Sequence, residues 1–185
     1  MKSYLTHLEC TYCHATYPGD EVIRLCAECS KVLYPRYDLA GARNALNPDE
    51  LKNRPANMWR YFEVMPVLDE ANVITLGEGF TPIFKAERLG DKIGASAVYI
   101  KDEGLNPTAS FKARGLSAAV SKAKELGIKI FFNHAVIDTK GRKKINSVTI
   151  SELNENLDKT VGKSKELSCD LLCVSGGWTP TVHLF

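Results

Sequence analysis

Four of the six cysteines in this 185-residue chain occur in two close pairs, at positions 10 and 13 and at positions 26 and 29. Two intervening residues allow a tight turn to direct both sulfurs of a pair toward one point, and 12 residues separate the two pairs. Four convergent thiolates favour zinc or an iron centre, and zinc is the commoner structural choice. The spacing therefore predicts a zinc ribbon over residues 1–40, with the metal ligands Cys10, Cys13, Cys26 and Cys29.

A four-thiolate site has no open coordination position, so the predicted zinc is structural rather than catalytic. Two disulfides or free thiols are the alternatives. The first residues lack the apolar segment of a secretory signal, which predicts a cytoplasmic protein, and disulfides are disfavoured in that compartment. Between the pairs, residues 17–20 predict a turn and residues 22–25 a short strand.

Charge and hydropathy exclude several classes of partner. The formal net charge of +2 supplies no basic face for nucleic acid or for an acidic membrane surface. The sequence contains no apolar run of the ~20 residues needed to cross a bilayer. These features predict neither a nucleic-acid partner nor a membrane association, and they leave the oligomeric state open.

The middle of the chain predicts a connector and then the entry to an α/β domain. Residues 40–57 are polar with scattered prolines, which suits a surface connector that follows an extended segment at residues 34–39. The aromatic run at residues 58–62 predicts packing against the next domain. The sequence then predicts a tight glycine loop at residues 76–82, a short helix near residues 86–93 and a strand at residues 97–101.

A lysine stands at the start of the next predicted helix. Ser110 is a good N-cap and Gly127 a good residue just beyond the C-terminus. Lys112 therefore lies in the first turn, where the positive end of the helix dipole favours loss of its proton. A neutral amine can form an imine with an aldehyde, although a surface lysine that reaches water is the alternative. The predicted apolar face comprises Phe111, Gly115, Ala118, Ala119, Ala123 and Leu126.

Several motifs, taken together, resemble threonine synthases, which are fold-type II pyridoxal-phosphate enzymes related to the tryptophan synthase β-subunit. The resemblance covers residues 1–129 and rests on the first cysteine pair, the Trp-Arg-Tyr triplet at residues 59–61, Leu-Gly-Glu-Gly-Phe-Thr-Pro at residues 76–82 and Asn-Pro-Thr-Ala-Ser-Phe-Lys-Ala-Arg-Gly at residues 106–115.

The resemblance to threonine synthases has consequences for the site. It implies that Lys112 is the catalytic residue that carries pyridoxal phosphate and shuttles protons, and that Ser110 and Phe111 flank the cofactor. It also implies a small amino-acid substrate. The family pattern often has glycine and aspartate where this chain has Ala109 and Ala113.

The last part of the chain departs from that pattern. Residues 130–150 predict an antiparallel hairpin around a Lys-Gly turn, with the basic residues 140–144 in solvent. Residues 168–180 predict a buried strand that ends in a glycine turn, with Cys169 and Cys173 in apolar packing. The hairpin, the Cys-Asp-Leu-Leu strand and the Ser-Gly-Gly-Trp-x-Pro motif resemble part of the sarcosine oxidase α-subunit, a flavoprotein. Its flavin-binding glycine loop would lie upstream of this region, so no flavin function follows.

The predicted fold class is α/β, a fragment of a fold-type II enzyme preceded by a zinc ribbon and followed by a small β-rich tail. The predicted domains are residues 1–40, 41–129 and 130–185. Two resemblances within one chain predict a chimera, either a gene-fusion remnant or an assembly artefact. The expected function is that of a truncated threonine synthase, inactive as this chain, which would convert O-phospho-L-homoserine and water to L-threonine and phosphate through a pyridoxal-phosphate aldimine. The alternatives are a non-catalytic zinc-binding fragment and a flavoprotein fragment.

Overall fold

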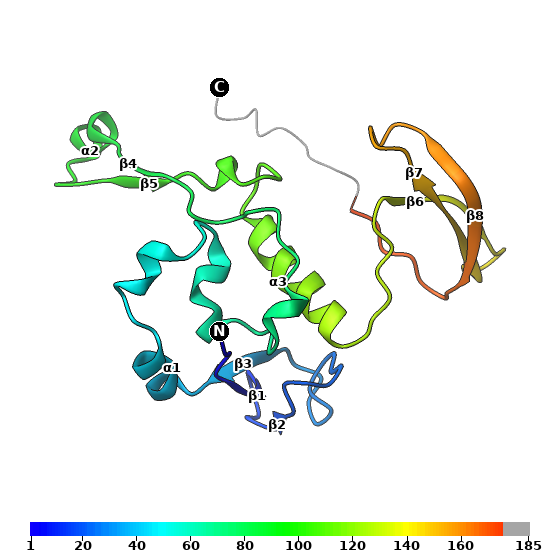
Figure 1. The fold of residues 1–185 in the computed structure, drawn as a ribbon, viewed down its shortest axis with the longest axis horizontal. Helices are drawn as coiled ribbons and strands as arrows, with labels where there is room; N and C mark the ends of the chain where they lie inside the picture. The colour runs from blue at the N-terminus through cyan, green and yellow to red at the C-terminus, as the bar shows by residue number, and fades with distance from the viewer. Residues whose placement is uncertain (176–185) are drawn as a thin grey trace. The chain divides into compact units, whose positions relative to one another are not determined.

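The computed structural model describes residues 1–175, and its first strands form a small antiparallel sheet (Figure 1). The sheet has the order β2-β1-β3, and the strands are β1 (Leu5–Cys10), β2 (Thr16–Tyr17) and β3 (Leu33–Tyr37). The strand predicted at residues 22–25 is wrong. β1 already pairs on both sides, and Val22 and Leu25 are exposed, so this segment has neither a backbone partner nor a buried face.

A short helix and three 3₁₀ turns follow the sheet, and the helix and the first turn lie in the segment for which the sequence predicted only a surface connector. α1 (Leu39–Ala45) begins because the Asp38 side chain accepts a hydrogen bond from the Gly41 N–H at 2.9 Å. The 3₁₀ turns are η1 (Glu50–Asn53), η2 (Met58–Val64) and η3 (Glu70–Asn72).

The hydrophobic core of this part of the chain forms around η2. It contains Met58, Trp59, Phe62 and Val67, and the rings of Trp59 and Phe62 lie 6.3 Å apart between centroids. The packing role predicted for the aromatic run therefore holds for Met58, Trp59 and Phe62, whereas Tyr61 is exposed.

A two-stranded sheet leads to the lysine helix. β4 (Ile83–Lys85) pairs antiparallel with β5 (Tyr99–Lys101), and α2 (Glu87–Ile93) lies between them in the chain, as predicted. η4 (Glu103–Leu105) then precedes α3 (Lys112–Glu125).

The C-terminal end of α3 agrees with the sequence, but its buried face does not. Gly127 has φ +68°, and the Gly127 and Ile128 N–H groups donate to the carbonyls of Lys124 and Ala123. The buried residues are Ala113, Ser117 and Ser121 rather than the predicted apolar set. The serine face is preferred because both hydroxyls donate to the Ile74 carbonyl, so burial costs them no hydrogen bond.

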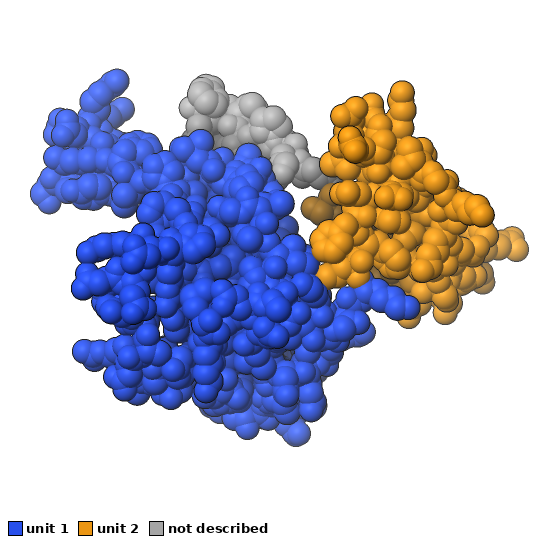
Figure 2. Space-filling model, in the orientation of Figure 1, with its two compact units in different colours: residues 1–129 blue, residues 130–185 orange. Residues whose placement is uncertain are grey.

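The chain divides into two compact units, residues 1–129 and residues 130–185 (Figure 2). The second unit contains a meander of β6 (His134–Lys140), β7 (Ser147–Leu153) and β8 (Thr160–Ser168), with Val148 and Ile150 buried on the central strand. The predicted hairpin is confirmed as β6 and β7, and residues 141–144 are exposed.

The sequence did not predict β8 and instead predicted a strand further along the chain, at residues 168–180. β8 is rich in lysine and contains a glycine, so it shows no apolar alternation, yet its backbone pairs with β7. The predicted buried strand at residues 168–180 is wrong over its described part, because regular structure ends at Ser168 and Leu171, Cys173 and Val174 are exposed. Residues 176–180, which carry most of the Ser-Gly-Gly-Trp-x-Pro motif, lie outside the described residues. Within residues 1–175, no helix combines the length and apolar character that a membrane span requires.

Candidate functional site

The predicted cofactor lysine is the first residue of α3. Lys112 is exposed, and its Nζ lies 5.2 Å from the centroid of the Phe111 ring. The Ser110 hydroxyl is buried and accepts a hydrogen bond from the Lys112 N–H at 3.2 Å. The three predicted residues are thus consecutive at the start of α3: the Ser110 hydroxyl is bonded to the first helical N–H, the Phe111 ring lies beside the Lys112 amine, and Lys112 is exposed.

A half-buried carboxylate, that of Glu103, fixes the loop that precedes Lys112. Glu103 accepts two hydrogen bonds from Arg114, from Nε and from one terminal nitrogen, each at 2.7 Å. It also accepts from the Thr81 hydroxyl at 2.6 Å and the Asn106 amide at 2.8 Å. The Arg114 guanidinium, then the Thr81 hydroxyl, hold the pKa of Glu103 far below its ordinary value of 4.5. This Glu103 cluster joins three parts of the chain: the glycine loop, η4 and α3.

The glycine loop is fixed to the same cluster. The Gly79 N–H donates to the Asn106 side-chain oxygen at 3.0 Å, and Gly79 has φ +103°. A Cβ atom at Gly79 would lie 2.6 Å from the Met58 nitrogen, so only glycine fits. At Gly79, the predicted glycine loop therefore approaches the backbone of η2.

Glu78 is a second carboxylate in this region, and it is 1% exposed. It accepts hydrogen bonds from the Trp59 ring N–H at 3.2 Å, the Thr75 hydroxyl at 2.8 Å and the Leu76 N–H at 2.9 Å. Burial raises the pKa of Glu78, but the hydrogen bonds that the carboxylate accepts lower this pKa by more. The net pKa lies below its ordinary value, so the carboxylate is held in its charged form. Sequence reasoning missed both Glu78 and Glu103, because a single glutamate in a loop carries no spacing signal.

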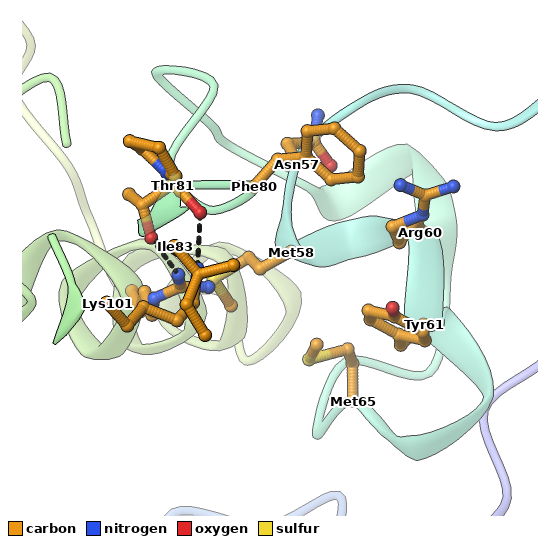
Figure 3. A pocket seen from close by; sticks show the side chains of 11 residues that line it. Asn57, Met58, Arg60, Tyr61, Met65, Phe80, Thr81, Ile83 and Lys101 are labelled. Carbon is orange, nitrogen blue, oxygen red and sulfur yellow. Dashed lines mark hydrogen bonds between the residues drawn. The ribbon is translucent and has the colours of Figure 1, made fainter. Parts of the chain in front are cut away.

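Next to these groups lies a cavity of about 700 Å³ (Figure 3). Three cationic side chains, Arg60, Lys101 and Arg114, line it together with Met58, Tyr61, Met65, Phe80 and Ile83. Lys101 donates to the Thr81 hydroxyl at 2.7 Å, as Figure 3 shows. Ser110, Phe111 and Lys112 do not line this cavity, so it is separate from the predicted cofactor residues.

Ala109 is strained, and this leads to a prediction. Its φ is +55°, a region where an L-residue with a Cβ costs about 1–2 kcal/mol. We expect Ala109→Gly to raise the free energy of unfolding by about 0.5–1 kcal/mol, measured by urea denaturation, since glycine loses some of that gain to backbone entropy. Ala118→Gly in the regular part of α3 is the matched control and should lower stability by ~1 kcal/mol. A loss of stability in Ala109→Gly would contradict the strain argument.

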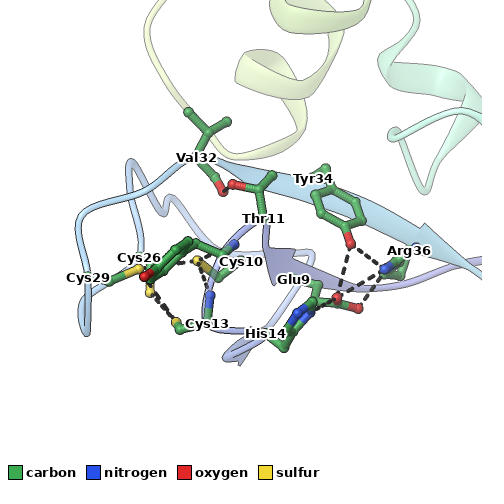
Figure 4. Close-up of polar contacts among 11 residues, drawn as sticks. Glu9, Cys10, Thr11, Cys13, His14, Cys26, Cys29, Val32, Tyr34 and Arg36 are labelled. Carbon is green, nitrogen blue, oxygen red and sulfur yellow. Dashed lines mark hydrogen bonds and ion pairs between the residues drawn. The ribbon is translucent and has the colours of Figure 1, made fainter.

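The four paired cysteines form a second site (Figure 4). Their sulfur atoms all lie within 4.8 Å of one another, and Cys10 to Cys29 and Cys13 to Cys26 are each 3.4 Å apart. A tetrahedral zinc with Zn–S bonds of ~2.3 Å requires S···S distances of about 3.8 Å, so the donor set fits the ion. All six cysteines of the chain are free, which removes the disulfide alternative for this structure.

The two cysteine turns share one backbone geometry. In each, the N–H of the first cysteine donates over 2.9 Å to the carbonyl of the residue five positions later, Ala15 in one turn and Lys31 in the other. In each, the residue after the second cysteine has a positive φ, 63° at His14 and 57° at Ser30. The Tyr12 and Cys13 N–H groups also point at the Cys10 sulfur, at 3.4 and 3.5 Å.

The pKa values of the four thiols are shifted in opposite directions, down at Cys10 and Cys26 and up at Cys13 and Cys29. The Tyr17 hydroxyl and nearby N–H groups lower the pKa of Cys26 to about 6. At Cys13 the Ala15 N–H lowers the pKa, but the neighbouring thiols and burial outweigh it and raise the pKa to about 12. Four adjacent thiols cannot all ionise without a cation between them, so the site fits a divalent metal.

The stretch that contains Lys112 matches a known family. Residues 74–141 match the family model described as pyridoxal-phosphate dependent enzyme. Threonine synthase of Methanosarcina acetivorans is 42% identical over 122 residues, which are 66% of this chain and 29% of that protein. Threonine synthase of Methanocaldococcus jannaschii is 39% identical over 121 residues, 65% of this chain and 30% of that protein. The chain is similar to threonine synthases.

A shorter match agrees with these two. Threonine synthase of Halalkalibacterium halodurans is 49% identical over 76 residues, 38% of this chain and 21% of that protein. The chain thus spans about 30% of the length of the two archaeal threonine synthases that it matches over most of its own length. No solved structure matches the chain. The family-model match runs past Lys129 to Gly141, further than the predicted end of the resemblance.

Proposed function

We propose that this chain carries the lysine-bearing part of a threonine synthase-like enzyme, in which Lys112 holds pyridoxal phosphate. The observation that carries the proposal is an exposed lysine at the start of α3, inside the stretch that matches pyridoxal-phosphate dependent enzymes. When bound, the cofactor withdraws electrons from the carbon next to a substrate amino group. The proposed reaction converts O-phospho-L-homoserine and water to L-threonine and phosphate.

The residues of the chain have distinct roles in this proposal. Lys112 Nζ would attach the cofactor and carry protons. Phe111 would lie beside the cofactor ring, while Ser110 fixes the first turn of the helix through its hydroxyl. The Glu103 cluster would hold the loop of residues 106–111 in place, because Asn106 and Arg114 flank Lys112 on both sides in sequence. We also propose that Cys10, Cys13, Cys26 and Cys29 bind one structural zinc ion.

Labelling tests the lysine. We expect incubation with pyridoxal phosphate followed by borohydride reduction to place one pyridoxyl group on Lys112, identified by peptide mass spectrometry. Lys112→Arg keeps the charge but removes the primary amine, so the label should be lost. Lys124→Arg, another exposed lysine of α3, is the matched control and should leave the label unchanged. Label spread evenly over many lysines would show that Lys112 is not the attachment site.

The resemblance of residues 130–185 to the sarcosine oxidase α-subunit and the chimeric origin stay predictions. A continuous sequencing read of independent source DNA across the codons of Lys129 and Ile130 tests the artefact version of the chimera. An uninterrupted read would refute it.

A further inference from the structure

A tyrosine hydroxyl lies beside one sulfur of the four-cysteine site. Tyr17 Oη is 3.2 Å from Cys26 Sγ, and it accepts a hydrogen bond from the Ala27 N–H at 2.9 Å. Tyr17 belongs to β2 and pairs with Leu8 of β1, so a sheet rather than a free loop sets its position. Cys26 is only 2% exposed, which leaves little room for water to replace the hydroxyl.

The direction of this contact follows from the chemistry of the two groups. A metal-bound cysteine is a thiolate and has no proton to donate. The phenol has one O–H donor, and its oxygen already accepts a hydrogen bond from the Ala27 N–H. With metal bound, Tyr17 must therefore donate to Cys26, and a hydrogen bond to a charged sulfur is stronger than one between neutral groups.

The corresponding position of the other cysteine turn lacks this donor. Tyr17 follows Cys10 by seven residues, and Leu33 follows Cys26 by seven. Leu33 pairs with Cys10 across β3 and β1, but its side chain has no hydrogen-bonding group. The two turns therefore share a backbone geometry, whereas the tyrosine donor distinguishes Cys26 from Cys10.

We propose that Tyr17 is a positioning residue of the metal centre, whose hydroxyl donates to the Cys26 thiolate and orients it toward the ion. This inference rests on the proposed zinc site. Hydrogen-bond partners of metal ligands fix the direction of the ligand and adjust its electron donation, and their loss typically weakens metal binding ~10–100-fold. The Tyr17 ring would remain in Tyr17→Phe, so the substitution removes the donor with little change in packing.

The test compares zinc and cobalt binding by the full chain and two variants. Tyr17→Phe should weaken zinc binding about tenfold in competition with a chromophoric chelator. In the cobalt-loaded protein, its sulfur-to-metal charge-transfer bands should move to longer wavelength, because a sulfur without the hydrogen bond gives up its electrons more easily. Tyr12→Phe is the matched control, since Tyr12 is 72% exposed, and both measurements should stay as in the parent chain.

The outcomes separate this inference from the zinc site itself. If the parent chain binds no zinc, the zinc site and the role of Tyr17 are both wrong. If the parent chain binds zinc and Tyr17→Phe matches it in affinity and spectrum, only the role of Tyr17 is wrong. Weaker affinity with an unchanged cobalt spectrum also overturns the inference, because Tyr17 would then act only through the Ala27 N–H.

Discussion

Replacing Cys10 with serine is expected to abolish zinc binding and to unfold the small sheet of β1, β2 and β3. The reason is the lack of any other core there. Within residues 1–38, the buried side chains are Ser3, Cys10 and Cys26, so apolar burial contributes little to the stability of this segment. A structural zinc supplies on the order of 10–16 kcal/mol in small zinc domains, so the proposed metal would be the main source of stability here.

The measurement is the zinc content of the purified chain together with amide hydrogen exchange of residues 1–38. We expect one zinc per parent chain, none in Cys10→Ser, and fast exchange in β1 and β3 of the variant. Cys173→Ser is the matched control, because Cys173 is exposed and lies outside the cluster, and it should retain both zinc and protection. Full protection in Cys10→Ser, or a metal-free parent chain with a protected sheet, would refute a zinc-dependent fold. Chelator treatment of the parent chain should reproduce the effect of Cys10→Ser.

The parts of the site that short-range patterns encode were predictable from the sequence. The two-residue spacing in each cysteine pair imposes a turn, and the structure brings all four sulfurs together. Helix α3 was predictable because the signals at its ends come from neighbouring residues. The Ser110 hydroxyl accepts a hydrogen bond from the Lys112 N–H, and Gly127 adopts a positive φ. Each of these features depends on residues within a few positions of one another.

The supporting contacts were not predictable, because they join segments far apart in the chain. Ser117 and Ser121 are buried only because the Ile74 carbonyl lies where their hydroxyls can reach it. Glu103 looks like an ordinary polar loop residue until Thr81 and Arg114 are brought to it. Apolar periodicity therefore selected the wrong face of α3, and single glutamates gave no signal.

Replacing Glu103 with glutamine should lower the free energy of unfolding of residues 1–129 by about 2–3 kcal/mol at pH 7, the value typical of hydrogen bonds to a charged group. Glutamine keeps the shape but cannot accept both Arg114 hydrogen bonds, and it leaves the guanidinium without its counter-charge. Urea denaturation measures the effect. Glu166→Gln is the matched control: the Glu166–Lys140 pair is more than half exposed on both sides, so its loss should lower the free energy of unfolding much less than the loss of the Glu103–Arg114 pair.

The pH dependence separates a charge effect from a packing effect. Because Arg114 and Thr81 depress the pKa of Glu103 in the folded chain, its contribution is fully present above the ordinary value of 4.5 and is lost as the pH falls toward the depressed pKa. The difference in the free energy of unfolding between the parent chain and Glu103→Gln should therefore shrink as the pH falls below about 4.5. A difference that stays constant from pH 7 to pH 3 would show that glutamine disturbs packing instead. Since the same cluster fixes the loop before Lys112, pyridoxyl labelling of Lys112 should also fall in Glu103→Gln at pH 7, whereas Glu166→Gln should label like the parent chain.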